Sequence, residues 1–325
     1  MIEDKKAPLD VRVDPRVELI SILQRLVGER EYTRALATSY VAAVDAHFKP
    51  FAQHPAVAAT RELRRRSITY DAPMQLAVHL DDKLQLRAVP ADPRFTGVDL
   101  ESYLQTVRDF ASASGFDEFF ARHRADHARM TEQLRTAITA DDPRAWFDSF
   151  FGERPGARFV VIAAPLNGTW IYGAHAGDEV YQILGIYKVD FDELPVVDTD
   201  ILELVVHEIA HSYINPLFDK HRAALEPHGT RLFARVEEPM RKQAYGVWHI
   251  MLNELAVRAV TTLYILDRRG KDAANAAAQK EVSRSFLWTP ELAKLLLTKY
   301  RADRARYPDM DAFVPEIIAF LAAQP

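Results

Sequence analysis

The segment from residue 201 to residue 216, ILELVVHEIAHSYINP, constrains the fold of this chain more than any other part of the sequence. The residues around its two histidines are almost all apolar, so we expect a buried helix over residues 201–214 that ends before Pro216. On such a helix, His207 and His211 stand one turn apart on one face. Because a buried helix that carried these imidazoles without a ligand would hold costly polar groups, the segment predicts a metal site.

The residues His207-Glu208-Ile209-Ala210-His211 form an H-E-x-x-H pattern, which is typical of zinc hydrolases. Neutral imidazole nitrogens bind zinc at about 2.0–2.1 Å, and a catalytic zinc keeps one position open for water. The zinc lowers the pKa of that water toward neutrality. A carboxylate beside the water, here Glu208, can take its proton and pass it to the leaving amine. The pattern therefore predicts one zinc ion with Glu208 as general base.

The third ligand must be a histidine, aspartate or glutamate, because the chain contains no cysteine. The extension that adds a third histidine requires Gly at 214 and His at 217, where this chain has Ile214 and Leu217. A candidate is Glu254, in an apolar helix that we expect over residues 239–266, with Arg258 one turn later to orient it or to grip a substrate. The alternative is an exposed Glu–Arg helix pair. Rival ligands are Glu237, Glu238, His228 and His249.

The remaining sequence predicts an α+β fold that is mostly helical. Periodic apolar residues predict helices over most of the first half of the chain. A small sheet is expected within residues 158–188, from strands at 158–164, 169–175 and 180–188, since these stretches are rich in β-branched and aromatic residues. The length of 325 residues suggests two regions, a helical one at 1–152 and one at 153–325 that contains the sheet and the histidine helix.

Two segments together carry a resemblance to known families. The segment HEIAHSYINP, followed by NELAVRAV at residues 253–260, is similar to the gluzincin group of zinc peptidases, in which two histidines and a downstream glutamate hold the metal. More closely, it resembles an uncharacterised bacterial family of gluzincin-like domains, catalogued as a domain of unknown function. The helical front, with its YDAPMQLAVHL segment, fits that family. The resemblance implies a zincin-like catalytic core and favours Glu254 as third ligand, although the spacing from His211 to Glu254 is longer than in thermolysin-type enzymes.

The sequence gives weaker evidence for residues that would hold the substrate or stabilise the oxyanion. Zinc peptidases usually align an extended substrate on an edge strand, and the strand at 169–175 is the candidate because Gly173 permits close backbone approach; an ordinary hairpin strand is the alternative. As donors to a developing oxyanion we place Tyr245 and His228 first, ahead of His249 and Tyr213, with packed or surface side chains as the alternative. The pair His123 and His127 is interpreted as a solvated helix face.

The overall charge is nearly balanced, with 41 basic and 46 acidic residues, which gives no reason to expect a nucleic acid partner. The apolar stretches are too short to span a bilayer, and the first residues carry no signal-peptide pattern. We therefore expect a soluble protein, cytoplasmic or the mature part of an exported bacterial protein. The sequence predicts no oligomeric state.

These observations lead to the prediction of a zinc metallopeptidase that acts on a peptide or protein substrate. One alternative is a non-catalytic metal-binding scaffold or binding protein on a zincin-like fold. Another is a zinc hydrolase of a different amide or ester.

Overall fold

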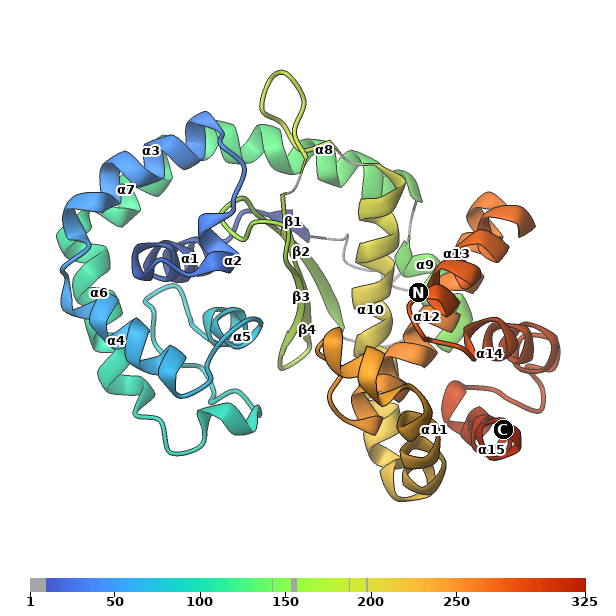
Figure 1. Ribbon diagram of the computed structural model, residues 1–325. Helices are drawn as coiled ribbons and strands as arrows, with labels where there is room; N and C mark the ends of the chain where they lie inside the picture. Colours follow the sequence, from blue (N-terminus) through green and yellow to red (C-terminus); the bar gives the residue numbers. More distant parts are fainter. Residues whose placement is uncertain (1–9, 142, 153–156, 187, 197) are drawn as a thin grey trace, which may run out of the picture. The chain divides into compact units, whose positions relative to one another are not determined.

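The computed structural model describes residues 10–141, 143–152, 157–186, 188–196 and 198–325, with the backbone alone at residues 199 and 200 (Figure 1). The chain divides into two compact units. The N-terminal unit comprises residues 1–141 and 156–199, and the C-terminal unit comprises residues 142–155 and 200–325. This partition differs from the expected division after residue 152, because the strands group with the first helices. Residue 153, the expected start of the second region, lies outside the described residues.

The N-terminal unit combines helices with one sheet. Its strands are β1 (Asp10–Arg12), β2 (Arg158–Ala164), β3 (Ile171–Ala176) and β4 (Glu179–Gly185). Its helices are α1 (Pro15–Val27), α2 (Arg30–Thr33), α3 (Ser39–Phe48), α4 (Pro55–Arg65), α5 (Ala72–Val78), α6 (Leu100–Ser114), α7 (Phe116–Arg122) and α8 (Arg124–Asp141), with the 3-10 turns η1 (Lys49–Phe51) and η2 (Pro93–Phe95). The prediction of an α+β, mostly helical fold is confirmed.

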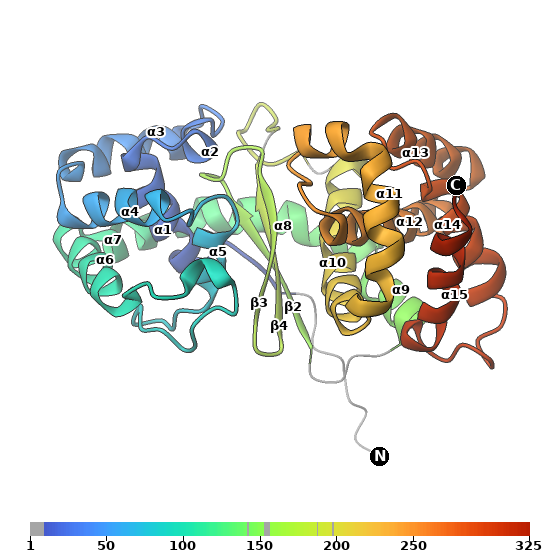
Figure 2. The same ribbon diagram turned by 60° about the horizontal axis from the view of Figure 1, so that its bottom comes forward.

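The sheet is mixed, with the strand order β1-β2-β4-β3. Strands β1, β2 and β4 run parallel. Strand β3 pairs antiparallel with β4 as a hairpin (Figure 2). The three predicted strands are confirmed, while β1 was not predicted, since three residues are too few to show a period of two. Strand β3 lies at an edge of the sheet, as expected, and the carbonyl of Gly173 accepts a hydrogen bond of 3.2 Å from Gln75 Nε2 of α5.

Alternate residues of the sheet form the core of the N-terminal unit. Val160 and Ile162 of β2 and Tyr181 and Ile183 of β4 belong to one buried cluster that also contains the apolar residues of α1. Because successive strand residues point to opposite faces, these four side chains share one face of the sheet. Burial of this face against the helices supplies the main hydrophobic stabilisation of the unit.

The C-terminal unit is helical in the residues that the structure describes. It consists of α9 (Pro143–Phe151), α10 (Thr199–Lys220), α11 (Arg222–Lys242), α12 (Trp248–Arg269), α13 (Lys271–Ser283), α14 (Thr289–Leu295), the π-helical turn η3 (Leu296–Tyr300) and α15 (Met310–Ala323). Helix α12 is buried along most of its length and contacts α11, α13 and α14. It is therefore the central helix of this unit.

Two of the prolines inside helices, Pro216 and Pro239, stand where the sequence predicted a helix boundary. Helix α10 continues through Pro216 to Lys220, although the ring removes the hydrogen bond to the carbonyl four residues earlier, at a typical cost of about 3 kcal/mol. Burial of Ile214 and Phe218 on either side of the proline offsets this cost. The predicted end of this helix at residue 214 is therefore wrong, because tertiary packing overrides the local preference.

The helix predicted to begin at Pro239 begins instead at Trp248. Pro239 lies inside α11, which ends with the amide of Tyr245 bonded to the carbonyl of Met240 and that of Ala244 bonded to Arg241. This pair of bonds is a Schellman motif, and its left-handed position is occupied by Ala244 (φ 69°). Because an alanine takes the place where a glycine is usual, the sequence did not reveal this helix end.

A glycine sets the distance between α11 and α12. A Cβ atom added to Gly229 would lie 2.5 Å from the ring of Trp248 and 2.8 Å from the side chain of Leu252. Both contacts are closer than van der Waals packing allows, so only glycine permits this approach of the two helices. The contact fixes the first turns of α12, which lead to Glu254.

Candidate metal centre

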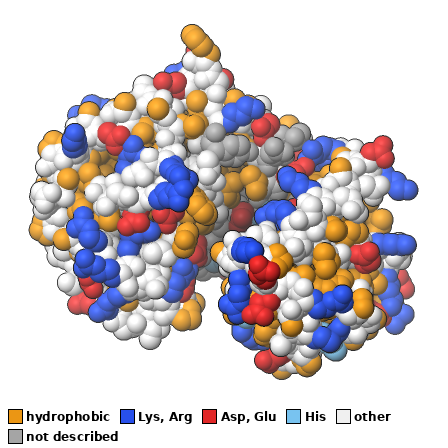
Figure 3. Space-filling model, viewed as in Figure 1, with side chains coloured by type: hydrophobic (Ala, Val, Ile, Leu, Met, Phe, Trp, Pro, Cys, Tyr) orange, Lys and Arg blue, Asp and Glu red, His pale blue; other side chains and the backbone are white. Residues whose placement is uncertain are grey.

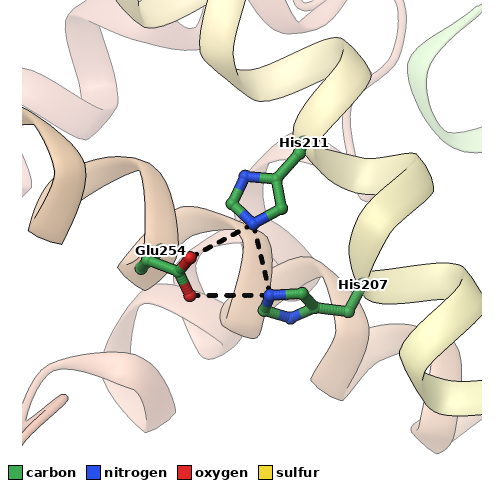
Figure 4. Close-up of side chains that lie close together, drawn as sticks. All are labelled: His207, His211 and Glu254. Carbon is green, nitrogen blue, oxygen red and sulfur yellow. Dashed lines mark hydrogen bonds and ion pairs between the residues drawn. The ribbon is translucent and has the colours of Figure 1, made fainter. Parts of the chain in front are cut away.

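Helix α10 brings two imidazoles together. His207 and His211 are separated by one helical turn, and their Nε2 atoms lie 3.2 Å apart with the rings inclined at 77° (Figure 4). Both side chains are mostly buried, with 16% and 17% of their surfaces exposed. The neighbouring Val206, Ile209 and Ala210 are buried in the unit, which fixes the helix face on which the rings stand.

Helix α12 supplies a carboxylate that faces both rings. Glu254 Oε1 lies 3.3 Å from His211 Nε2, and Glu254 Oε2 lies 3.5 Å from His207 Nε2. Figure 4 shows the three side chains pointing toward one common point from two helices. Within the described residues, they form the one group of three or more histidine or acidic side chains close enough to hold a metal ion.

The spacing of the three donors fits a metal ion. A tetrahedral ion with bonds of about 2.0–2.1 Å holds neighbouring ligand atoms about 3.3–3.4 Å apart. The three distances in this structure, 3.2, 3.3 and 3.5 Å, lie close to that value. Two neutral imidazoles and one carboxylate also offer the nitrogen and oxygen donors that divalent transition metals accept. His207, His211 and Glu254 can therefore hold a metal ion, as predicted.

The electrostatics of the three groups are strongly coupled. Burial alone would lower the pKa of His211, but the hydrogen bond and charge of Glu254, together with the charge of Glu208, raise this pKa to about 9. Burial acts to raise the pKa of Glu254, and the hydrogen bonds and charges of the two histidines overcome it and hold the pKa well below its usual range. Glu254 is thus a carboxylate at neutral pH, the form that binds metal.

Asn215 orients one of the imidazoles. Its Oδ1 atom lies 3.1 Å from His211 Nδ1, one helical turn after His211. An amide oxygen only accepts hydrogen bonds, so Nδ1 keeps its proton when His211 releases the other ring proton to bind a metal, and Nε2 then presents its lone pair to the centre. Such a partner on the second ring nitrogen is the usual companion of a metal-binding histidine. Asn215 was not predicted as a site residue, although its spacing from His211 is the same as that between the histidines.

Arg258 donates a hydrogen bond to Glu254, the third donor. Its Nη2 atom donates to Glu254 Oε2 at 2.7 Å and to the Tyr245 hydroxyl oxygen at 3.1 Å, and its Nη1 donates to Glu281 Oε2 at 2.6 Å. The arginine is 5% exposed, so the pair with Glu254 is buried rather than an exposed helix pair. Glu281 was not singled out from the sequence, because nothing in its surroundings on the amphipathic α13 distinguishes it.

The predicted supporting residues lie in different settings. Glu208 is half-buried on α10, next to His207. Tyr245 lies in the turn between α11 and α12, outside the helix that was expected over residues 239–266, and contacts Arg258. His228 lies half-buried on α11, and its imidazole makes no hydrogen bond or ion pair with another described residue.

The rival candidates do not join the three donors. Glu237 and Glu238 form exposed pairs with Arg241 and Lys242 one turn later on α11. Tyr213 stacks on Phe147 and Phe151. His249 lies on the first turn of α12 beside Trp248, with a ring-centre distance of 5.6 Å.

The interpretation of His123 and His127 as one solvated helix face is wrong. The helix breaks between them, since α7 ends at Arg122 and α8 begins at Arg124. His127 is buried against Tyr40, and burial lowers the pKa of His127 to about 4. It is therefore a neutral core histidine.

Basic and acidic side chains are interspersed over the face drawn in Figure 3. In the described ranges, no helix combines the length and the apolar character that crossing a lipid bilayer requires.

Comparison with known proteins gives one match. No curated protein and no solved structure matches the chain. A family model described as Domain of unknown function (DUF4932) matches residues 91–320, a range that includes His207, His211 and Glu254. Because this match spans well over half of the 325 residues, the chain belongs to the family described as Domain of unknown function (DUF4932).

Proposed function

We propose that this protein is a zinc-dependent hydrolase, and most specifically a gluzincin-like metallopeptidase. In this proposal His207, His211 and Glu254 bind one zinc ion and Glu208 is the general base. The observation that carries the proposal is the mutual spacing of 3.2–3.5 Å between three donor atoms, with a carboxylate-bearing residue directly after the first histidine.

The donor set favours zinc in a catalytic rather than a structural setting. Structural zinc sites are usually closed by four protein ligands, whereas two histidines and one glutamate are the ligands of thermolysin-type zinc peptidases. When bound, the ion would supply Lewis acidity and lower the pKa of a water at its open position. The three side chains are not fully enclosed, because they keep 11–17% of their surfaces exposed.

Glu208 would perform the proton transfers. Glu208 follows His207 directly on α10, and its charge is one of the causes that raise the pKa of His211, which supports this role. In peptide hydrolysis, this carboxylate takes a proton from the attacking water and delivers it to the leaving amine nitrogen. A scaffold that only binds metal needs no such base, so the presence of Glu208 favours a hydrolase over the non-catalytic alternative.

Tyr245 would assist by polarising the substrate carbonyl. Its oxygen accepts a hydrogen bond from Arg258, so its own hydroxyl proton is directed to another acceptor. We therefore rank Tyr245 above His228 for this role. Alignment of an extended peptide on the edge strand β3 stays a prediction, as does the choice of a peptide over another amide or an ester.

Zinc content and peptide hydrolysis of the wild type and of Glu208→Gln test this proposal. We expect Glu208→Gln to retain one zinc per chain and to lose hydrolysis by about 10²–10⁴-fold, the usual contribution of a general base. Unchanged hydrolysis in Glu208→Gln would remove the mechanism.

The ligand assignment is tested by a matched pair of glutamate variants. Glu254→Ala should lose zinc, while Glu238→Ala, which removes a carboxylate that is 81% exposed, should keep it. The opposite order would reassign the third ligand.

A further inference from the structure

The guanidinium of Arg258 is fixed from three sides by groups of three different segments. Glu254 lies on α12, Glu281 on α13, and Tyr245 in the turn that precedes α12. The ring of Phe286 lies under the guanidinium, with 4.2 Å between its centre and the guanidinium carbon. The side chain of Arg258 is 6% exposed. Its orientation is therefore set by the packing of the unit.

This enclosure excludes Arg258 as a group that grips a substrate. Both Nη atoms are engaged by partners of this chain, and Nε is buried without a hydrogen-bond partner among the described residues. A substrate would have to displace the buried ion pairs of Arg258 with Glu254 and Glu281 to reach the guanidinium, and breaking buried ion pairs carries a high cost. The side chain is built to act on Glu254.

The two oxygens of Glu254 have different surroundings. Both oxygens face the histidines, with Oε1 3.3 Å from His211 Nε2 and Oε2 3.5 Å from His207 Nε2. Only Oε2 also accepts the bond from Arg258, at 2.7 Å, and Oε1 has no bond from the arginine. A carboxylate oxygen that accepts a charge-assisted bond gives up part of its electron density to that bond. Oε1 is thus the better donor toward the centre.

We propose that Arg258 and Glu281 are positioning residues that make Glu254 a one-oxygen ligand. Arg258 holds Oε2, and Glu281 holds Arg258 in the orientation that this requires. A carboxylate that binds through one oxygen leaves a coordination position open for water, whereas binding through both oxygens would fill it. The inference rests on the proposed function, since it assumes that the centre binds metal.

The conservative variants Arg258→Lys and Glu281→Gln test this inference. Lysine keeps the positive charge and loses the planar two-nitrogen geometry, and glutamine keeps the shape of Glu281 and loses its charge. The control is Arg284→Lys, because Arg284 also bonds Glu281, at 3.4 Å, but makes no hydrogen bond to Glu254 and is 41% exposed. Far-ultraviolet circular dichroism establishes that each variant is folded.

Two measurements on the metal-loaded protein decide the outcome. Competition with a chelator should show zinc affinity reduced about tenfold or more in Arg258→Lys and several-fold in Glu281→Gln, as is usual when a partner of a metal ligand is lost. The visible absorption of the cobalt(II) form should be intense in the wild type, as for low coordination number, and weaker in Arg258→Lys, where both oxygens can bind. The control should match the wild type in both.

If the zinc affinity and the cobalt(II) spectrum are unchanged in Arg258→Lys and Glu281→Gln, the inference is overturned, while the proposed metal centre is not affected. A wild-type protein that binds neither zinc nor cobalt would instead remove the proposed function on which the inference rests. Equal changes in the Arg284→Lys control would also overturn it, because they would assign the effect to local packing.

Discussion

The amide of Asn215 should contribute measurably to metal binding. Replacing Asn215 with alanine removes the acceptor that lies 3.1 Å from His211 Nδ1. The ring of His211 then loses both the preference for the tautomer that exposes Nε2 and the constraint on its rotation. Helix α10 itself should not weaken, since alanine favours the helical state over asparagine by about 0.5 kcal/mol.

The size of the effect follows from the contact. A half-buried neutral hydrogen bond contributes about 0.5–1.5 kcal/mol, and a lost partner of a metal-binding histidine typically lowers affinity about 10- to 100-fold. We therefore expect zinc to bind about tenfold more weakly to Asn215→Ala. Asn215→Asp should bind zinc at least as tightly as the wild type, because a carboxylate accepts the same bond and makes the imidazole a stronger donor.

Competition of the protein with a chromophoric zinc chelator at constant pH measures these affinities. The control is Asn275→Ala, because Asn275 is an exposed asparagine on α13. Equal affinities for the wild type and Asn215→Ala, or a loss in Asn215→Asp as large as in Asn215→Ala, would refute the role of this hydrogen bond.

Two further predictions concern stability. Burial raises the pKa of Glu18 to about 8, against the bond from Tyr40, so the folded chain holds a proton that the unfolded chain releases near pH 4.5. The stabilisation from this bound proton is complete below pH 4.5 and is lost as pH rises to 8, a change on the order of 5 kcal/mol in the free energy of unfolding. Urea unfolding at several pH values should therefore show a flatter pH profile for Glu18→Gln than for the exposed control Glu62→Gln. Gly229→Ala should lower the free energy of unfolding by about 1–3 kcal/mol, because the added Cβ would lie 2.5 Å from Trp248. The control Thr230→Ala changes an exposed residue and should not lower it. Equal urea midpoints for the two variants would contradict the packing argument.

The fold class was predictable because its signals are local. The strands at 158–164 and 180–185 show β-branched runs, and the histidine helix shows apolar residues on every side of its motif. The helix ends were not predictable at Pro216 and Ala244. At Pro216, the buried Ile214 and Phe218 keep the helix going, although the residue before a proline disfavours the helical backbone. At Ala244, the helix ends with an alanine in the left-handed conformation, where the sequence signal for a helix end would be a glycine. Such decisions depend on contacts that a single segment does not contain.

The metal donors could be found from sequence and their supporting residues only in part. His207 and His211 are recognisable because one helical turn is a fixed distance, and Asn215 follows the same rule. Glu254 required a choice among several acidic residues, and its burial in the structure separates it from the exposed Glu238. Glu281 comes from another helix, so only the packing of α12 against α13 brings it to Arg258.

Anomalous X-ray diffraction at the zinc absorption edge, from crystals grown with zinc, tests the central claim most directly. We predict one peak per chain, at about 2.0–2.1 Å from His207 Nε2, His211 Nε2 and one carboxylate oxygen of Glu254. A peak at other side chains, or no peak with these three side chains turned apart, would contradict the proposed metal centre and the hydrolase that depends on it.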